Sequence, residues 1–230
     1  MKRKVITVLA VIVLLAGISI FLLPTIFQWY YNQTVTEYIE RFEEDTTDPE
    51  DNGLLEALYQ KLLAENQKLF DQGQSELKDP FSYETPGIDL MEYGLKDNSI
   101  GYLVIPKIDE RLPVYLGASE ENMKKGAVHL TETSYPIGGV NTNSVIAAHR
   151  GYYRANMFKN IDRLQVGDEM YIQNFRETLH YKVVETTIIM PDEVDKILIQ
   201  DGRDMVTLLS CHPYGQNKQR YVVYCERDER

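Results

Sequence analysis

The most hydrophobic stretch of the chain lies near its N-terminus, where no charged residue occurs from Val5 to Leu23. As a helix this stretch would span about 28 Å at ~1.5 Å per residue, close to the ~30 Å hydrocarbon thickness of a bilayer. Trp29, Tyr30 and Tyr31 follow, and such aromatics are enriched at membrane interfaces. The pattern predicts one membrane anchor. A cleaved signal peptide, which usually has a shorter apolar run, is the alternative.

The flanking charges predict the orientation of this anchor. Lys2, Arg3 and Lys4 precede the apolar run, and basic flanks of a membrane segment usually stay in the cytoplasm. We therefore expect a cytoplasmic N-terminus, with the chain after Gln28 outside the cell.

Helical spacing of apolar residues continues beyond the anchor. Tyr38, Ile39 and Phe42 recur three or four residues apart, as do leucines between Leu54 and Leu69, which favours two helices that pack on the rest of the protein. Pro49 lies in the acidic stretch between them and predicts a turn. Residues 77–98 are rich in proline and glycine without periodicity, which predicts a long loop of the kind that is often functional.

From Ser99 onward the pattern changes to short runs rich in valine, isoleucine and tyrosine, separated by turn residues. The expected strands are Ile100–Ile105, Leu112–Tyr115, Ser144–Ala148, Glu169–Gln173, Thr178–Ile189, Val206–Cys211 and Tyr221–Cys225. Many short strands of this kind predict a mainly β fold with short helices, built on a closed barrel or a sandwich. The expected divisions are residues 1–27 (cytoplasmic tip and anchor), 28–76 (helical region), 77–98 (loop) and 99–230 (β domain).

The charge and the cysteine count argue against several classes of function. The chain has 24 Lys and Arg against 35 Asp and Glu, a formal charge of −11, and such an acidic surface argues against nucleic acid as a partner. Its 2 cysteines are too few for a disulfide scaffold. Their positions lack zinc-site spacing, so we expect no metal.

Three polar residues lie where predicted strands end or begin. Cys211 closes one apolar strand, His149 follows another, and Arg220 opens the last. A thiolate is a nucleophile, an imidazole can accept its proton and pass it to a leaving amine, and a guanidinium can stabilise an oxyanion. Together these residue types suit acyl transfer through a thioester.

The segments around these residues resemble a known family. VIAAHRG, TLLSCHPYG and QRYVV are similar to the signature segments of sortases, the cysteine transpeptidases of Gram-positive surfaces. The resemblance implies a sortase-type closed β-barrel that needs no cofactor, with His149 as the catalytic His, Cys211 as the nucleophile and Arg220 as the catalytic Arg.

The loop before the barrel indicates a subclass. Asp79, Pro80 and Phe81 resemble the lid motif of class C sortases, in which the aromatic ring caps the Cys and the Asp points toward the Arg. The resemblance implies cleavage of the Thr-Gly bond in an LPXTG-like signal and transfer to a Lys amine of a pilin. Pilin proteins are therefore the expected partners.

Two other functions stay open. A housekeeping sortase would attach proteins to peptidoglycan, although such enzymes usually lack the lid motif. A surface adhesion module on a β-barrel would have no catalytic role for Cys211.

The remaining candidates receive non-catalytic interpretations. His212 replaces the small residue usual after the sortase Cys, and strand alternation predicts that it points away from Cys211. A disulfide between Cys211 and Cys225 is the alternative to a free thiol, but if Cys211 and Arg220 face each other in a hairpin, Cys225 lies about 16 Å further along the strand at ~3.3 Å per residue, too far for a bridge. Cys225 is therefore expected to pack in the core. His129 is expected to be structural, His180 to be exposed, and Arg150 to be solvated unless it pairs with a carboxylate.

Overall fold

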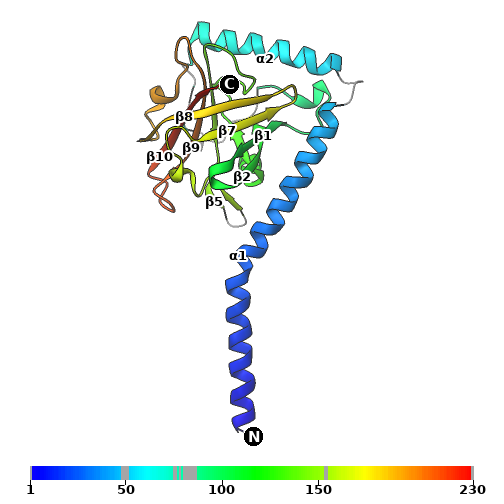
Figure 1. Ribbon diagram of the computed structural model, residues 1–230, viewed down its shortest axis with the longest axis vertical. Coiled ribbons are helices and arrows are strands. Elements are labelled where there is room, and N and C mark those ends of the chain that lie inside the picture. The colour runs from blue at the N-terminus through cyan, green and yellow to red at the C-terminus, as the bar shows by residue number, and fades with distance from the viewer. Residues whose placement is uncertain are drawn as a thin grey trace.

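The computed structural model describes residues 2–47, 52–74, 77, 79, 87–152 and 155–228. Eight strands of this described chain close into a barrel in the order β1-β2-β3-β4-β9-β10-β8-β7, and β7 pairs with β1 (Figure 1). These strands are β1 (Ser99–Ile105), β2 (Glu110–Leu116), β3 (Ala127–His129), β4 (Thr142–Ala147), β7 (Glu169–Asn174), β8 (Thr178–Ile189), β9 (Asp204–His212) and β10 (Gln219–Arg227). The prediction of a closed barrel preceded by helices is confirmed.

Both faces of the central strands are buried. Val145 and Ile146 are neighbours on β4 and are both fully inaccessible, as are Leu208 on β9 and Val222 on β10. Strands buried on both faces have continuous apolar runs instead of alternating patterns, which explains the sequence of this part of the chain.

Strand direction determines where the strand ends meet. Most neighbours in the barrel are antiparallel, but β4 runs parallel to β9, so their C-terminal ends lie at the same edge. A separate hairpin of β5 (Arg150–Tyr152) and β6 (Ala155–Met157) follows β4 directly at that edge.

Two long helices precede the barrel. In α1 (Lys2–Thr47) the apolar run and the first predicted helix form one continuous helix, and α2 (Asn52–Gln72) lies across the far side of the barrel (Figure 1). Tyr38, Ile39 and Phe42 on α1 are buried against the barrel, as are Leu58 and Leu62 on α2. Both helices therefore pack on the barrel as predicted, except that Leu54, the first leucine of the predicted α2 face, is exposed.

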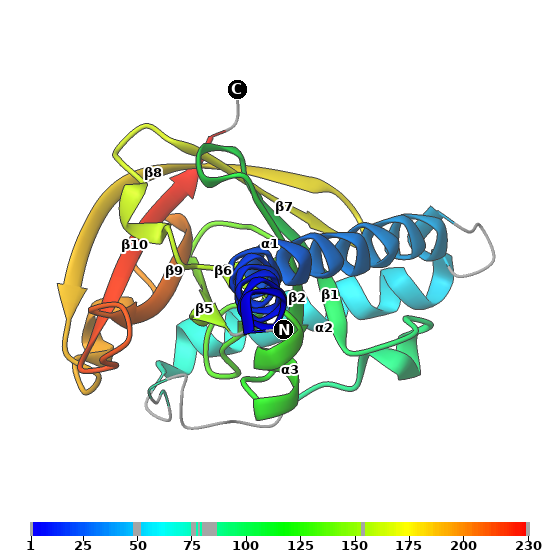
Figure 2. The same cartoon turned by 90° about the horizontal axis from the view of Figure 1, so that it is seen from below.

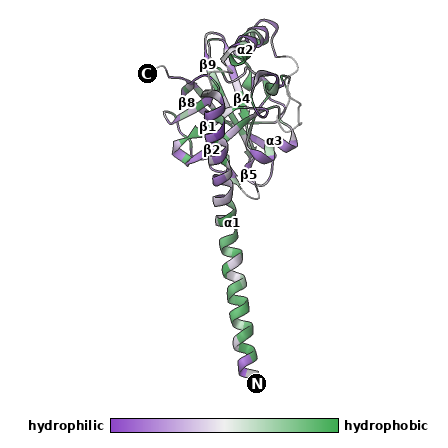
Figure 3. Ribbon diagram, turned by 90° about the vertical axis from the view of Figure 1, so that its right-hand side faces the viewer, coloured by the Kyte–Doolittle hydropathy of each residue, from purple (hydrophilic) through white to green (hydrophobic). Residues whose placement is uncertain are grey.

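The N-terminal part of α1 extends away from the barrel. It is almost uniformly hydrophobic (Figure 3), and none of its most apolar window is buried. The view from below looks along this part of the helix (Figure 2). Its length and composition fit a single-pass membrane anchor.

Shorter helices complete the fold. They are the α-helix α3 (Glu120–Lys125) and the 3-10 helices η3 (Leu90–Tyr93), η4 (Pro106–Ile108), η5 (Ile161–Arg163) and η6 (Val194–Ile197). Within the expected loop, Ile88, Leu90 and Leu95 are buried in the main core, so residues 87–98 pack firmly against the barrel.

Candidate active site

The strand register brings the three candidate residues to one edge of the barrel. Arg220 on β10 lies directly opposite Cys211 on β9. On the other side of β9, Ala147 at the end of β4 pairs with Leu209. His149 follows Ala147, and Cys211 follows Leu209, by the same number of residues, so both reach the same edge of the barrel. Buried Ser210 donates a hydrogen bond from Oγ to the Ala148 carbonyl at 2.8 Å and ties the two ends together.

Cys211 is nearly buried, with 5% of its surface exposed. Burial raises the pKa of its thiol, Arg220 and Arg150 act in the opposite direction, and Asp79 adds to the increase. The resting side chain is therefore a thiol at neutral pH, with two nearby guanidinium groups that favour the thiolate.

His149 is half-buried and held from two sides. Its ring stacks on Tyr152, with centroids 5.0 Å apart and planes at 13°. Its carbonyl accepts hydrogen bonds from the backbone N–H groups of Gly151 at 2.9 Å and Phe158 at 3.0 Å. Burial, and secondarily the charge of Lys124, lowers the pKa of the imidazole. A neutral ring with a fixed backbone is suited to accept a proton.

Arg220 is buried and forms a two-point ion pair with the segment that precedes the barrel. Its Nε donates to Asp79 Oδ1 at 2.8 Å, and its Nη2 donates to Asp79 Oδ2 at 2.6 Å. Its Nη1 also donates to the carbonyls of Asn217 and Gln219. Such a two-point pair both neutralises the guanidinium charge and holds the guanidinium in one orientation. Pro80 and Phe81, the other residues of the predicted lid motif, lie outside the described residues.

Arg150 is a residue of this site that sequence reasoning missed. We expected it to be solvated unless it pairs with a carboxylate, and the second alternative holds: only 5% of its side chain is exposed, and its Nη2 pairs with Asp162 at 2.5 Å. Its Nη1 lies 2.7 Å from Nδ1 of His212 and 3.4 Å from the Cys211 carbonyl. The default of solvation failed because the β5–β6 hairpin folds this residue back against the end of β9.

The other candidates have structural surroundings. Cys225 is a fully buried free thiol in the core, as expected. His129 is also fully buried, and its Nε2 lies 3.0 Å from the Ser134 carbonyl. His180 is less exposed than expected, because its ring stacks on Tyr171. Within the described ranges no three His, Cys, Asp or Glu side chains form a metal-binding group.

Comparison with known proteins identifies the family. The model of the sortase domain matches residues 103–228, a region that contains His149, Cys211 and Arg220. The chain belongs to the sortase family. Known sortases are cysteine transpeptidases, so the thiol, imidazole and guanidinium at one edge have the residue types of that chemistry.

Curated relatives match about half of the chain. Sortase D of Bacillus subtilis is 28% identical over 130 residues, which are 55% of this chain and 63% of that protein. The chain thus spans less than two thirds of the length of the curated relatives it matches.

Solved structures match more of the chain. Sortase C of Streptococcus pneumoniae, whose structure is described as informative on catalysis and pilin substrate specificity, has a TM-score of 0.76 and 36% identity. The match covers 84% of this chain and 97% of that one. A lid mutant of Streptococcus agalactiae sortase C1 has a TM-score of 0.71 and 32% identity, over 84% and 97% of the two chains. The likeness therefore extends beyond the barrel, to segments that precede it.

Proposed function

We propose that this chain is a membrane-anchored cysteine transpeptidase of the pilin-polymerising type, with Cys211, His149 and Arg220 as its catalytic residues. The observation that carries the proposal is the register of β9, which brings these three residues from separate strands to one edge. The substrate is an LPXTG-like sorting signal, and the bond that breaks joins its Thr and Gly.

The first half of the reaction acylates the enzyme. His149 takes the thiol proton, and the sulfur of Cys211 attacks the Thr carbonyl carbon. Arg220 stabilises the oxyanion of the tetrahedral intermediate. The C–N bond then breaks as His149 returns the proton to the departing Gly amine, which leaves a thioester on Cys211.

The second half transfers the acyl group. A neutral Lys amine of the next pilin attacks the thioester, His149 accepts the amine proton, and the Cys211 sulfur leaves and is reprotonated. The product is an isopeptide bond between the two subunits. Each half has a covalent intermediate, so the mechanism predicts ping-pong kinetics.

The ion pair between Asp79 and Arg220 supports two parts of the proposal, a lid over the site and the pilin-polymerising subclass. Asp79 occupies two donors of Arg220 that would otherwise face the substrate carbonyl, so the segment that carries Asp79 must move before the oxyanion can be stabilised. The chain is similar to a sortase C structure described for pilin substrate specificity and to a lid mutant of sortase C1. These similarities favour a lid and a pilin substrate for this chain as well. We infer that residues 77–98 contain a lid, with Asp79 as its contact to Arg220.

The location follows from the anchor and its charges. The basic residues before the apolar run favour an N-terminus in the cytoplasm, which places the barrel on the extracellular side. A phosphatase fused after the last residue should be active only in that orientation, and an inactive fusion in correctly inserted protein would reverse it.

The test of catalysis uses mass spectrometry on the full chain with an LPXTG-type peptide. We expect a covalent adduct at Cys211 that is absent from Cys211→Ala. Because a closed lid can block the reaction, Asp79→Ala and Phe81→Ala are measured beside the wild type. Absence of an adduct in all of these would contradict the transpeptidase and favour an adhesion module.

A second experiment tests the acceptor. The preformed thioester is offered a Lys-containing pilin fragment and a peptidoglycan-type amine in competition. Preference for the pilin lysine supports the pilin-polymerising type, whereas preference for the peptidoglycan amine would favour a housekeeping sortase.

A further inference from the structure

The candidate catalytic edge of the barrel lies beside the end of the apolar run of α1. The backbone N–H of Asn156 on β6 donates to Oε1 of Gln28 on α1 at 2.7 Å. A pocket of about 270 Å³ has Pro24 and Gln28 on one wall and Gly151, Tyr152 and Tyr214 on the other. Pro24 directly follows the apolar run Val5–Leu23, so the edge is level with the end of the anchor.

Two connections at this edge lie next to the proposed catalytic residues. The β5–β6 hairpin begins directly after His149, and the turn between β9 and β10 begins after His212, the residue that follows Cys211. Figure 1 shows both on the side of the barrel from which the free part of α1 extends. The opposite side is covered by α2.

Exposed aromatic side chains lie at this edge of the barrel and on α1 just after its apolar run. Tyr214 in the β9–β10 turn is 59% exposed, and Trp29 and Tyr30 on α1 are 61% and 66% exposed. Rings with an apolar body and a polar tip are enriched at the headgroup level of bilayers. The position of Tyr214 next to the anchor gives its exposure a physical reason.

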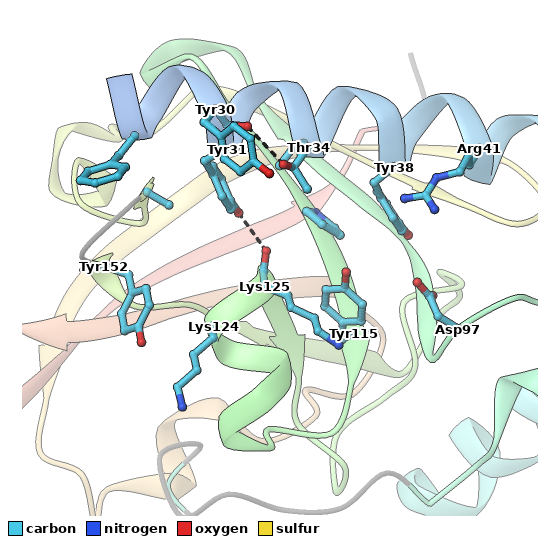
Figure 4. Close-up of a pocket in the computed structure, with 14 residues that line it drawn as sticks. Tyr30, Tyr31, Thr34, Tyr38, Arg41, Asp97, Tyr115, Lys124, Lys125 and Tyr152 are labelled. Carbon is cyan, nitrogen blue, oxygen red and sulfur yellow. Dashed lines mark hydrogen bonds between the residues drawn. The ribbon is translucent and has the colours of Figure 1, made fainter. Parts of the chain in front are cut away.

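Basic residues adjoin these aromatics. A pocket of about 620 Å³ between α1 and the barrel is lined by Tyr30, Tyr31, Tyr152, Lys124 and Lys125, among others (Figure 4). Lys159 lines the smaller pocket beside Tyr214. Lys124 and Lys125 form ion pairs with Glu120 and Glu121 at 2.5 and 2.6 Å, so this part of the edge carries both signs of charge. A lipid partner is therefore favoured by the aromatic side chains and by the position of the anchor.

We propose that the catalytic edge of the barrel docks on the outer surface of the lipid bilayer, with Tyr214 in the headgroup region as an anchor outside α1. The inference rests on the membrane anchor and orientation proposed above. Its consequence is that Cys211 lies close to the membrane surface and favours peptides held in the same bilayer over soluble peptides.

The test uses fluorescence, because Trp29 is the 1 tryptophan of the chain. The full chain is placed in nanodiscs whose phosphatidylcholine is brominated near the headgroup end, which quenches tryptophans that touch it. In a Trp29→Phe background, Tyr214→Trp reports the docking edge. Leu54→Trp, at a 46% exposed site on α2, is the matched control.

We expect Tyr214→Trp to be quenched at least roughly half as strongly as native Trp29, and Leu54→Trp to keep its fluorescence. Equal fluorescence of Tyr214→Trp and Leu54→Trp, with Trp29 quenched, would overturn the docking and leave the anchor intact. An unquenched Trp29 would overturn the anchor and the docking together.

A rate comparison tests the consequence. The sorting peptide is supplied either with an apolar tail in the same nanodisc or as a soluble peptide, and thioester formation is timed. Tyr214→Ser should lower the ratio of the two rates by about fivefold, because docking raises the local concentration of a membrane-held substrate. An unchanged ratio would contradict the inference.

Discussion

At the scale of single residues, the thiol of Cys211 lies between charges of opposite effect. Arg220 and Arg150 favour its thiolate, while Asp79 and burial oppose it. Its nucleophilicity is therefore set by which of these groups is in place, and substitutions of the two kinds should act in opposite directions.

Asp79→Asn removes a negative charge that raises the pKa of Cys211. The pKa should fall, and alkylation of Cys211 at pH 7 should accelerate by about two- to tenfold, since a shift of up to about one unit changes the thiolate fraction by up to tenfold. The measurement is the pH dependence of iodoacetamide labelling. An unchanged or slower reaction would contradict both the charge argument and the lid.

Arg150→Gln should have the opposite effect. Loss of this guanidinium raises the pKa of Cys211, so labelling at pH 7 should slow by about two- to tenfold. The lost hydrogen bonds should also lower the free energy of unfolding by about 1–3 kcal/mol. Arg176→Gln is the matched control, because Arg176 pairs with Glu56 of α2. If both variants label at the wild-type rate, Arg150 has no influence on the thiol.

The apolar strands in the sequence predict that Cys211, His149 and Arg220 lie at strand ends, and the structure has these ends at one edge; their proposed roles come from the family resemblance. The sequence could not reveal Arg150, since a basic residue after His149 has no local signal of burial. Of its partners, Asp162 follows beyond the β5–β6 hairpin and His212 lies 62 residues beyond Arg150 along the chain.

At the scale of elements, long apolar strands were predictable and short ones were not. The run Thr178–Ile189 coincides with β8, and Ser99–Ile105 extends the predicted first strand by one residue. In contrast, β3, β5 and β6 have 3 residues each, too few for a periodic pattern. They form because the barrel and the loops around them provide partners.

The pairing of β1 with β7 requires a glycine at position 101. A Cβ at this position would lie 2.0 Å from the backbone oxygen of Gln173 on β7, at the irregular register between β1 and β2. Its carbonyl also accepts a hydrogen bond from the Tyr38 hydroxyl of α1 at 3.1 Å. The glycine therefore lets β1 approach β7 while it holds α1.

Gly101→Ala should reduce the free energy of unfolding by about 1–3 kcal/mol, because backbone atoms must shift to admit the methyl group. Urea denaturation in detergent measures this change. Gly53→Ala is the control, because a Cβ there has no atom within 4 Å and alanine favours the α2 helix. Equal stability of both variants would argue against close approach of β1 and β7.

At the scale of the whole molecule, a buried imidazole couples stability to pH. His129 is fully buried, and burial lowers its pKa to about 4. An unfolded chain has a histidine pKa near ~6.5, so between these values the unfolded state binds a proton that the native state does not. Stability is therefore complete above about pH 6.5 and decreases as the pH falls toward 4.

The expected loss from this one group is up to about 3 kcal/mol, from about 1.4 kcal/mol per pH unit. Urea unfolding of wild type and His129→Gln across pH 4–7 isolates it, since the difference between them should shrink as the pH falls. His180→Gln, at a partly exposed position, is the matched control. Parallel curves for wild type and His129→Gln would contradict a neutral buried ring.

The unbroken course of α1 has a consequence for how the molecule meets its substrates. One continuous helix passes from the apolar run to the buried face that contains Tyr38 and Phe42, and it changes direction along its length (Figure 1), with Pro24 inside it. A helix restricts the distance and tilt of the reactive centre more than a loop would, so partners diffusing in two dimensions meet it within a narrow range of heights and from one side.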